Sequence, residues 1–133
     1  MPCVVLVEES VIHIRLSGFL SLEDLMSVSK QLRALEDASP ISIHRLTDMT
    51  DVAGSSLSFE TMEDFVATRR HVALKNSIRS AIVAPGLLAY GLARMFQSLN
   101  NNPQIEVKLF KVLDEALFWI SDSSQGVVEG NSK

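Results

Sequence analysis

Two patterns of hydrophobic positions follow one another along the chain: short apolar runs typical of strands, and apolar stripes at helical spacing. The clearest run is Ile78 to Ala84, which from Ala81 onward is apolar at every position. Such a run is typical of a strand that is buried on both faces and covered by helices. We therefore expect it to be the centre of a parallel sheet, with Pro85 and Gly86 at the junction to the next helix.

Two more strands are predicted at the start of the chain. Cys3 to Glu8 is largely apolar, whereas Val11 to Leu16 alternates apolar and polar residues. Glu9 and Ser10 between them are the right number of residues for a tight hairpin, although they are not the Asn or Gly that such turns prefer. We predict an antiparallel pair whose second strand is broken at Gly18.

The rest of the chain alternates helices with strands. Good N-caps or strand-to-helix breaks predict helices that follow Ser21, Ser58, Gly86 and Asp114. A third strand is predicted from Pro40, with Ile41, Ile43 and Leu46 as its apolar positions and 47–51 as its polar end. Residues 52–58 are predicted to form a loop, and 105–112 the last strand.

This order of elements predicts an α/β fold. We expect a single-layer, mostly parallel five-stranded sheet with an antiparallel N-terminal strand, flanked by four helices that make right-handed crossovers. A length of 133 residues with 47% hydrophobic content fits one core. We expect one domain over residues 1–122, and a loosely ordered tail over 123–133 because that segment is rich in Ser, Gly and Asn and has no periodicity.

Composition narrows the classes of partner and cofactor. The formal charge of −4 removes the bulk attraction that nucleic-acid binders use. No apolar run approaches the ~20 residues that cross a bilayer, and no signal peptide is recognisable, so we expect a soluble, cytoplasmic protein without an integral membrane segment. Cys3 is the single cysteine, which excludes an internal disulfide and a cysteine-built metal site; we expect it to be a small buried residue. We expect no cofactor.

Several segments together resemble a known family. They are the first hairpin, the Gly18-Phe-Leu-Ser-Leu-Glu-Asp turn, the Arg45-Leu-Thr-Asp48 segment, the Ala81-Ile-Val strand and the closing Glu115-Ala-Leu-Phe-Trp-Ile. Over residues 4–120 the chain resembles the SpoIIAA-like family, which is related in fold to the STAS domains of anti-sigma-factor antagonists and more distantly to the lipid-binding SEC14 fold. The resemblance implies a non-enzymatic bacterial regulatory module that contacts another protein.

The resemblance also implies a candidate switch. In anti-sigma-factor antagonists, a serine of an Asp-Ser-Ser-Gly motif at the start of the second helix is phosphorylated. The matching region here runs from Asp51 to Ser58, with Gly54 before the serine pair and no Asp directly ahead of it, which argues against a phosphoswitch. The candidate switch or partner-binding residues are Ser55, Ser56 and Ser58, and simple helix capping is the alternative for them.

A second candidate site follows from the fold class. Open α/β sheets bind ligands beyond the carboxyl ends of their strands. This rule selects Asp48, Thr50, Asp51, Pro85 and Gly86, although Asp and Thr after a strand also serve as turn and cap residues. Spacing brings no third carboxylate or His to the two Asp residues, so we expect no metal site.

No group of residues forms a catalytic signature. His13, His44 and His71 are separated by whole predicted elements, and no nucleophile, base and oxyanion donor can be placed together, so we expect no enzyme. A basic group is a candidate contact for an acidic partner or a lipid headgroup; it comprises Arg69, Arg70, His71, Lys75 and Arg79.

Two functions remain open. The first is a protein-interaction module; the alternative is a carrier of a small apolar ligand or lipid, with walls at Phe59, Met62, Phe65, Tyr90, Met95 and Phe96. A cavity of several hundred Å³ would support the carrier, and a filled core the module. A further apolar group is a candidate homodimer surface, made of Phe118, Trp119, Val127 and Val128.

Overall fold

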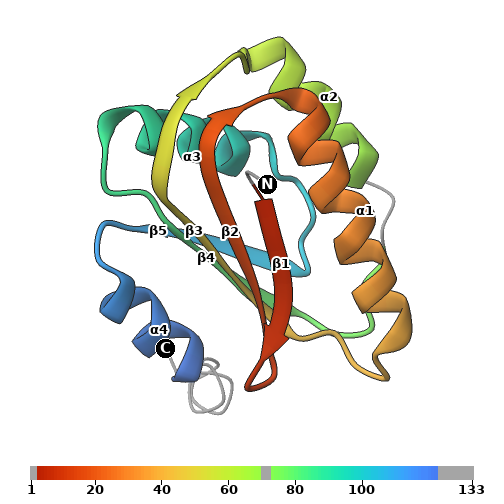
Figure 1. Cartoon of the computed structure of the whole chain (residues 1–133). Helices are drawn as coiled ribbons and strands as arrows, with labels where there is room; N and C mark the ends of the chain where they lie inside the picture. Colours follow the sequence, from red (N-terminus) through yellow and green to blue (C-terminus); the bar gives the residue numbers. More distant parts are fainter. Residues whose placement is uncertain (1–2, 70–72, 123–133) are drawn as a thin grey trace.

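A computed structural model of the chain describes residues 3–69 and 73–122 (Figure 1). The elements occur in the predicted order. They are β1 (Cys3–Glu8), β2 (Val11–Leu20), α1 (Leu22–Ala38), β3 (His44–Ser55), α2 (Phe59–Arg69), β4 (Ile78–Val83), α3 (Leu87–Leu99), β5 (Ile105–Phe110) and α4 (Leu113–Ser121).

The five strands form one sheet in the order β1-β2-β3-β4-β5. β1 is antiparallel to β2 and the other neighbours are parallel, as predicted. Helices α1, α2 and α3 cover one face, whereas α4 packs on the other, over β3, β4 and β5 (Figure 1). Among the described residues, no helix covers the outer face of β1 and β2.

The expectation that the strand from Ile78 is the centre of the sheet is wrong. β3 is the middle strand, and β4 lies between β3 and the edge strand β5. The burial that suggested a central position is nevertheless real. Ile82 belongs to the core under α1 to α3, and Ala81 and Val83 belong to the smaller core under α4. A strand next to the edge is buried on both faces here because α4 lies over this side of the sheet.

β2 and β3 are both longer than the sequence indicated. Gly18 does not end β2; it has a positive φ of 71° at an irregularity in the ladder, and β2 continues to Leu20. Ser17 to Leu20 pair with Asp51 to Ser55, so most of the predicted loop over 52–58 is strand. This pairing joins residues more than 30 positions apart, which local patterns do not reveal.

The start of β3 is also corrected. The strand begins at His44, so Ile41 and Ile43 precede it. The backbone N–H of Ser42 donates to Asn76 Oδ1 at 2.9 Å, and the Ser42 carbonyl accepts from Asn76 Nδ2 at 2.9 Å. Because a side chain takes both backbone groups, Ser42 is outside the sheet ladder.

The predicted helix caps are largely confirmed. Ser21 Oγ accepts from the Asp24 N–H and the Asp24 side chain accepts from the Ser21 N–H, which is a capping box. Ser58 Oγ accepts from the Thr61 N–H at 3.2 Å at the start of α2. At the C-terminal end of the domain two bounds shift: β5 ends at Phe110, and α4 begins at Leu113, before Asp114.

The β1–β2 hairpin gives a first testable prediction. Glu9 and Ser10 have φ of 53° and 65°, the positive values that a two-residue type I′ turn requires. Most side chains disfavour this region, so we expect the double substitution Glu9→Asn, Ser10→Gly to raise the free energy of unfolding by about 1 kcal/mol. Urea unfolding measures it. The control Glu9→Gln, Ser10→Ala should give no gain, and an equal gain in both variants would contradict the explanation.

Candidate functional site

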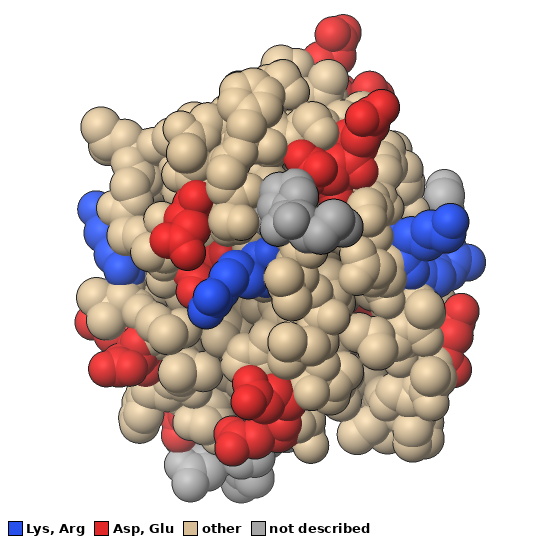
Figure 2. All heavy atoms as spheres, in the orientation of Figure 1, with Lys and Arg blue, Asp and Glu red and all other residues tan. Residues whose placement is uncertain are grey.

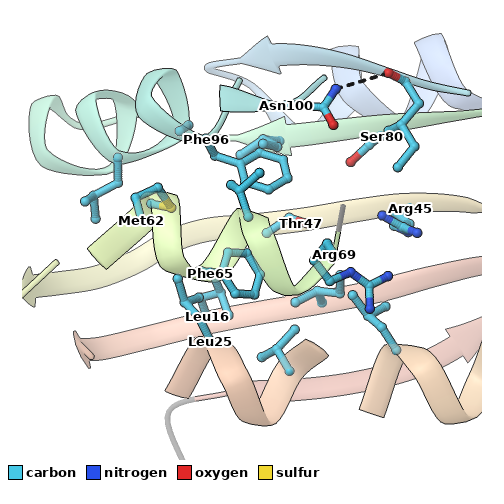
Figure 3. Close-up of a pocket in the computed structure, with 18 of the residues that line it drawn as sticks. Leu16, Leu25, Arg45, Thr47, Met62, Phe65, Arg69, Ser80, Phe96 and Asn100 are labelled. Carbon is cyan, nitrogen blue, oxygen red and sulfur yellow. Dashed lines mark hydrogen bonds between the residues drawn. The ribbon is translucent and has the colours of Figure 1, made fainter. Parts of the chain in front are cut away.

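The main core contains a cavity of about 110 Å³ between the sheet and the three helices on its face (Figure 3). Most of its lining is aliphatic or aromatic. Leu16 comes from β2, Leu25 from α1, Met62 and Phe65 from α2, and Phe96 from α3. The Phe65 and Phe96 rings are 6.2 Å apart between centroids. These elements meet because each presents its apolar stripe to the same face of the sheet.

Polar residues gather at one end of this cavity. Arg45 and Thr47 alternate on β3 and therefore face the same side of the sheet, and Ser80 is the partner of Arg45 on β4. Arg45 is 6% exposed and Ser80 is 4% exposed. Within the described residues, the Thr47 and Ser80 hydroxyls have no hydrogen-bond partner. Asn100, after α3, lines the same region but donates to the Ile105 carbonyl (Figure 3).

A buried ion cluster stands behind this polar end. Glu36 lies in the last turn of α1. Its Oε2 accepts a hydrogen bond from Arg45 Nη2, and Arg69 Nη2 donates to both carboxylate oxygens, at 3.1 Å to Oε1 and 3.0 Å to Oε2. Arg69 Nη1 donates to the carbonyl and hydroxyl of Ser29, each at 3.2 Å. The Glu36 side chain is only 10% exposed. We call Arg45, Glu36 and Arg69 the buried triad.

The buried triad has an excess of positive charge. Two guanidinium groups share one carboxylate, and Arg45 Nε is buried with no hydrogen-bond partner among the described residues. Burial lowers the pKa of Arg45; the Glu36 carboxylate opposes this change, and the Arg69 charge adds to it. Arginine nonetheless keeps its proton in proteins, so the site holds a donor that lacks an acceptor.

The residues predicted from the strand ends are located elsewhere. Asp48, Thr50 and Asp51 lie inside β3, which continues to Ser55, and Asp48 Oδ1 accepts from the Thr50 N–H at 2.9 Å. Pro85 and Gly86 are exposed between β4 and α3. Arg45 and Ser80 lie nearer the amino ends of their strands. The polar end of the cavity is therefore not at the carboxyl ends of the strands, where ligands of open α/β sheets usually bind. A ligand at the five predicted residues stays a prediction.

The three predicted serines have different environments. Ser55 Oγ donates to the Leu20 carbonyl at 3.0 Å and accepts from the Leu57 N–H at 2.9 Å. Ser58 caps α2. Ser56 is exposed, and its backbone N–H donates to the Leu20 carbonyl. The hydroxyls of Ser55 and Ser58 thus make local hydrogen bonds, whereas the hydroxyl of the exposed Ser56 makes none among the described residues.

The remaining ionisable candidates have structural environments. His44 Nδ1 accepts from the Arg79 N–H at 2.9 Å; burial lowers the pKa of His44, and the Arg79 charge adds to this. Cys3 is buried, and this burial raises the pKa of its thiol. In the described part of the chain, no three His, Cys, Asp or Glu side chains gather where they could hold a metal ion. Arg70 and His71 of the predicted basic group lie outside the described residues.

The face under α4 holds a second, open groove of about 340 Å³. Val4, Leu6, Leu113 and Leu117 supply its apolar walls, and Asp48 is one of its polar residues. The groove thus lies on the sheet face that α4 only partly covers.

Within the described residues, no helix is long and apolar enough to span a membrane.

The predicted homodimer surface is divided by the structure. Trp119 packs against Phe110 at 5.6 Å between ring centroids, and the Arg79 guanidinium lies 4.8 Å from the Trp119 ring, so this tryptophan holds α4 on the sheet. Phe118 points outward, 70% exposed. Val127 and Val128 lie outside the described residues, and the homodimer stays a prediction.

Comparison with known proteins identifies the family. The sequence model of the SpoIIAA-like family matches residues 11–121, which is most of the chain. The chain belongs to the SpoIIAA-like family. None of the curated proteins searched matches it.

Two solved structures share the SpoIIAA-like fold with this chain. An uncharacterised DUF3478 protein from Shewanella loihica PV-4 is 22% identical with a TM-score of 0.57, over 89% of this chain and 91% of that chain. An anti-sigma factor antagonist from Mycobacterium paratuberculosis is 18% identical with a TM-score of 0.53, over 90% of this chain and 93% of that chain. At these identities the likeness establishes the fold, in agreement with the predicted fold class.

The buried triad is the feature that sequence reasoning missed in this SpoIIAA-like domain. In the sequence, Arg45 stands out only as part of a segment that resembles the family. One signal was available: Arg45, Thr47 and Met49 alternate, and the apolar Met49 shows that this face of β3 is inward. An arginine in such a register requires a buried anion, but the sequence does not say that Glu36 supplies it.

Proposed function

We propose that this SpoIIAA-like chain is a non-enzymatic regulatory module that binds another protein through the end of the domain where α2 and α3 begin. The observation that carries this proposal is a group of large apolar side chains exposed at that end. Phe19 is 62% exposed, Phe59 55% and Leu87 94%. We call these three residues the apolar end. A contiguous patch of exposed apolar side chains is typical of a protein interaction site.

The apolar end is built on ordered elements. Phe19 is near the end of β2, Phe59 is the first residue of α2 and Leu87 the first residue of α3. The Phe19 ring lies against Gly54, where an added Cβ would be 3.0 Å from Phe19 Cδ1. The absence of a side chain at Gly54 thus leaves room for the Phe19 ring beside β3. A ring that is already packed in this way loses less entropy when a partner covers it.

Charge indicates the kind of partner. Glu60, Glu63 and Asp64 are exposed on α2, and Glu23 is exposed in the first turn of α1. Figure 2 shows acidic side chains over the end where α1 and α2 meet, and mostly uncharged residues around the start of α3. We infer that the partner presents apolar side chains flanked by Lys or Arg, because complementary charge steers association.

The family and fold support this function. An anti-sigma factor antagonist, as its name says, acts against another protein, and this chain shares its fold. Ser56 is exposed between β3 and α2, next to the apolar end, so a phosphate there would change the charge of the proposed surface. We keep Ser56 as the candidate switch residue, and Ser55 and Ser58 as residues that shape its loop.

The apolar end can be tested with matched variants. We expect tagged chain from its own host to yield a partner with which the purified chain forms a complex, and Phe59→Ser with Leu87→Ser to weaken that complex at least about tenfold. Isothermal calorimetry measures the affinity. Phe118→Ser, which removes one exposed apolar side chain from α4, should leave it unchanged. No reconstituted complex, or equal weakening by the α4 control, would reject the proposal.

The lipid-carrier alternative gains no support from the cavity. A volume of about 110 Å³ is below the several hundred Å³ that pockets for drug-sized molecules have. Of the six predicted walls, Met62, Phe65 and Phe96 line the cavity, whereas Phe59 and Tyr90 are exposed. The core is thus nearly filled.

A further inference from the structure

We propose that two copies of this chain pair antiparallel along β1, so that their sheets join into one continuous sheet across a two-fold axis at Val5. This surface differs from the one that the sequence suggested around Phe118. The inference goes beyond partner binding at the apolar end and does not depend on it. It rests on three observations: an edge strand without protection, the direction of its free backbone groups, and the match of its side chains with those of a second copy.

The first observation is the unprotected edge. β1 and β5 are the two edge strands of the sheet (Figure 1). β5 carries Glu106 and Lys108 near its middle, and charged side chains are one way in which proteins prevent an edge from pairing with another chain. From Cys3 to Val7, β1 has no charged residue or proline, and its ladder with β2 has no bulge. Three apolar side chains of β1 are exposed: Val4 by 45%, Leu6 by 44% and Val7 by 48%.

The second observation is the direction of the backbone groups. Glu8 and Val11 flank a two-residue turn, so they exchange both of their backbone hydrogen bonds. Such pairs alternate along an antiparallel ladder, and the N–H and C=O groups of Cys3, Val5 and Val7 therefore point away from β2. Among the described residues, no strand lies on that side of β1. A row of backbone donors and acceptors at a sheet edge is paired by another extended strand, which fixes the kind of occupant.

The third observation is that β1 is its own complement. The outward backbone groups of two copies meet when the strands run antiparallel with Val5 opposite the partner's Val5. The two-fold axis is then perpendicular to the sheet, so each face continues from one copy into the other. Val4 lies opposite the partner's Leu6 in this register. Cys3 lies opposite the partner's Val7, so every one of these cross-strand pairs is apolar.

The charges near β1 also favour this arrangement. Glu8 is the only charged residue of β1, and in the antiparallel pair it lies roughly 20 Å from the partner's Glu8, since six residues of strand separate them. Parallel pairing in register would place the two carboxylates side by side. Arg15 is the neighbour of Val4 on β2; it is exposed and has no ion-pair partner among the described residues. The partner's Glu8 would lie on the same face beyond Val4, which gives an attraction at each end of the pair.

The experiment measures the monomer–dimer equilibrium of the unmodified full chain by sedimentation equilibrium. One strand pair buries less area than a standard interface, so we expect a Kd in the micromolar range. Amide hydrogen exchange, followed by NMR below and above this Kd, locates the contact. At the higher concentration the N–H groups of Val5 and Val7 should exchange at least about tenfold more slowly, whereas those at the outer edge of β5 should not change.

Two matched variants test the register. Val4→Lys with Leu6→Lys puts like charges opposite one another at both positions and should weaken the dimer at least about tenfold. Val4→Lys with Leu6→Glu changes the same two exposed residues, but it puts each lysine opposite a glutamate of the other copy and should keep the dimer. A general effect of charge on β1 would change both variants equally.

Three results overturn the proposal. A monomer at every concentration would leave the edge of β1 to a strand of different sequence. A dimer in which Val5 and Val7 gain no protection would place the interface elsewhere, for example at Phe118. Equal weakening in the two variants would reject the antiparallel register. The unmodified chain decides the first two questions even where a variant does not fold.

Discussion

Replacing Glu36 by Gln is expected to lower the free energy of unfolding by about 3–5 kcal/mol, because it leaves two buried guanidinium groups without their anion. The Glu36 side chain is 10% exposed, and those of Arg45 and Arg69 are 7% and 12% exposed, so water cannot take over the lost pairing. Glutamine keeps the size of the side chain and an acceptor oxygen, so the change isolates the charge. Urea unfolding followed by circular dichroism measures the loss.

A neighbouring residue provides the control for this result. Asp37→Asn removes the same charge from the next position on α1, where the side chain is exposed. We expect its effect to stay within about 0.5 kcal/mol. A loss in Glu36→Gln no larger than that of Asp37→Asn would show that the buried triad does not hold α1, α2 and β3 together.

The joint replacement of the triad separates charge from packing. With Arg45→Met, Glu36→Leu and Arg69→Met together, no uncompensated charge remains in the core. Such apolar replacements of buried ion clusters are often neutral or stabilising. We therefore expect the triple variant to be more stable than Glu36→Gln alone.

Phe65→Ala is expected to cost about 3–5 kcal/mol, the range found when a buried aromatic side chain is deleted. Phe65 is 7% exposed, packs against Phe96 from α3 with the two rings tilted, and lines the cavity. Its removal would enlarge an existing void instead of allowing the helices to close over the gap, because the sheet and three helices hold the walls apart. Thermal and urea unfolding measure the loss.

The same helix supplies the comparison for Phe65. Phe59→Ala deletes an equal side chain that is 55% exposed at the start of α2, and we expect a loss below about 1 kcal/mol. Equal losses in the two variants would show that α2 is not held by the core beneath it. A large loss at Phe65 with loss of partner affinity only at Phe59 would separate the stabilising face of α2 from the binding surface that we propose.

Local signals in the sequence were sufficient for much of the fold. The caps at Ser21 and Ser58 depend on hydrogen bonds within three residues, so their sequence signatures predicted the starts of α1 and α2. The alternation of strands with helices predicted the mostly parallel sheet, because the crossover rule leaves few other arrangements. The hairpin was predicted from its length even though Glu9 and Ser10 are unusual there.

The errors have a common physical cause. The length of β3 depends on pairing with β2 beyond the irregularity at Gly18, and the late start of β3 depends on Asn76, 34 positions after Ser42. The position of β4 beside the edge depends on where α4 packs. None of these contacts lies within one element, so periodicity within a segment carries no information about them.

The sequence by itself thus predicted the order of the elements, the α/β class and the resemblance to the family. Only the tertiary structure decided that Glu36 and Arg69, 9 and 24 positions away along the chain, meet Arg45 in the core. It also decided that one carboxylate faces two guanidinium groups beside a cavity. The physical reason is that hydrogen bonding and side-chain alternation act between near neighbours in sequence, whereas a buried charge is balanced by whichever residues the packing of helices on the sheet brings within reach.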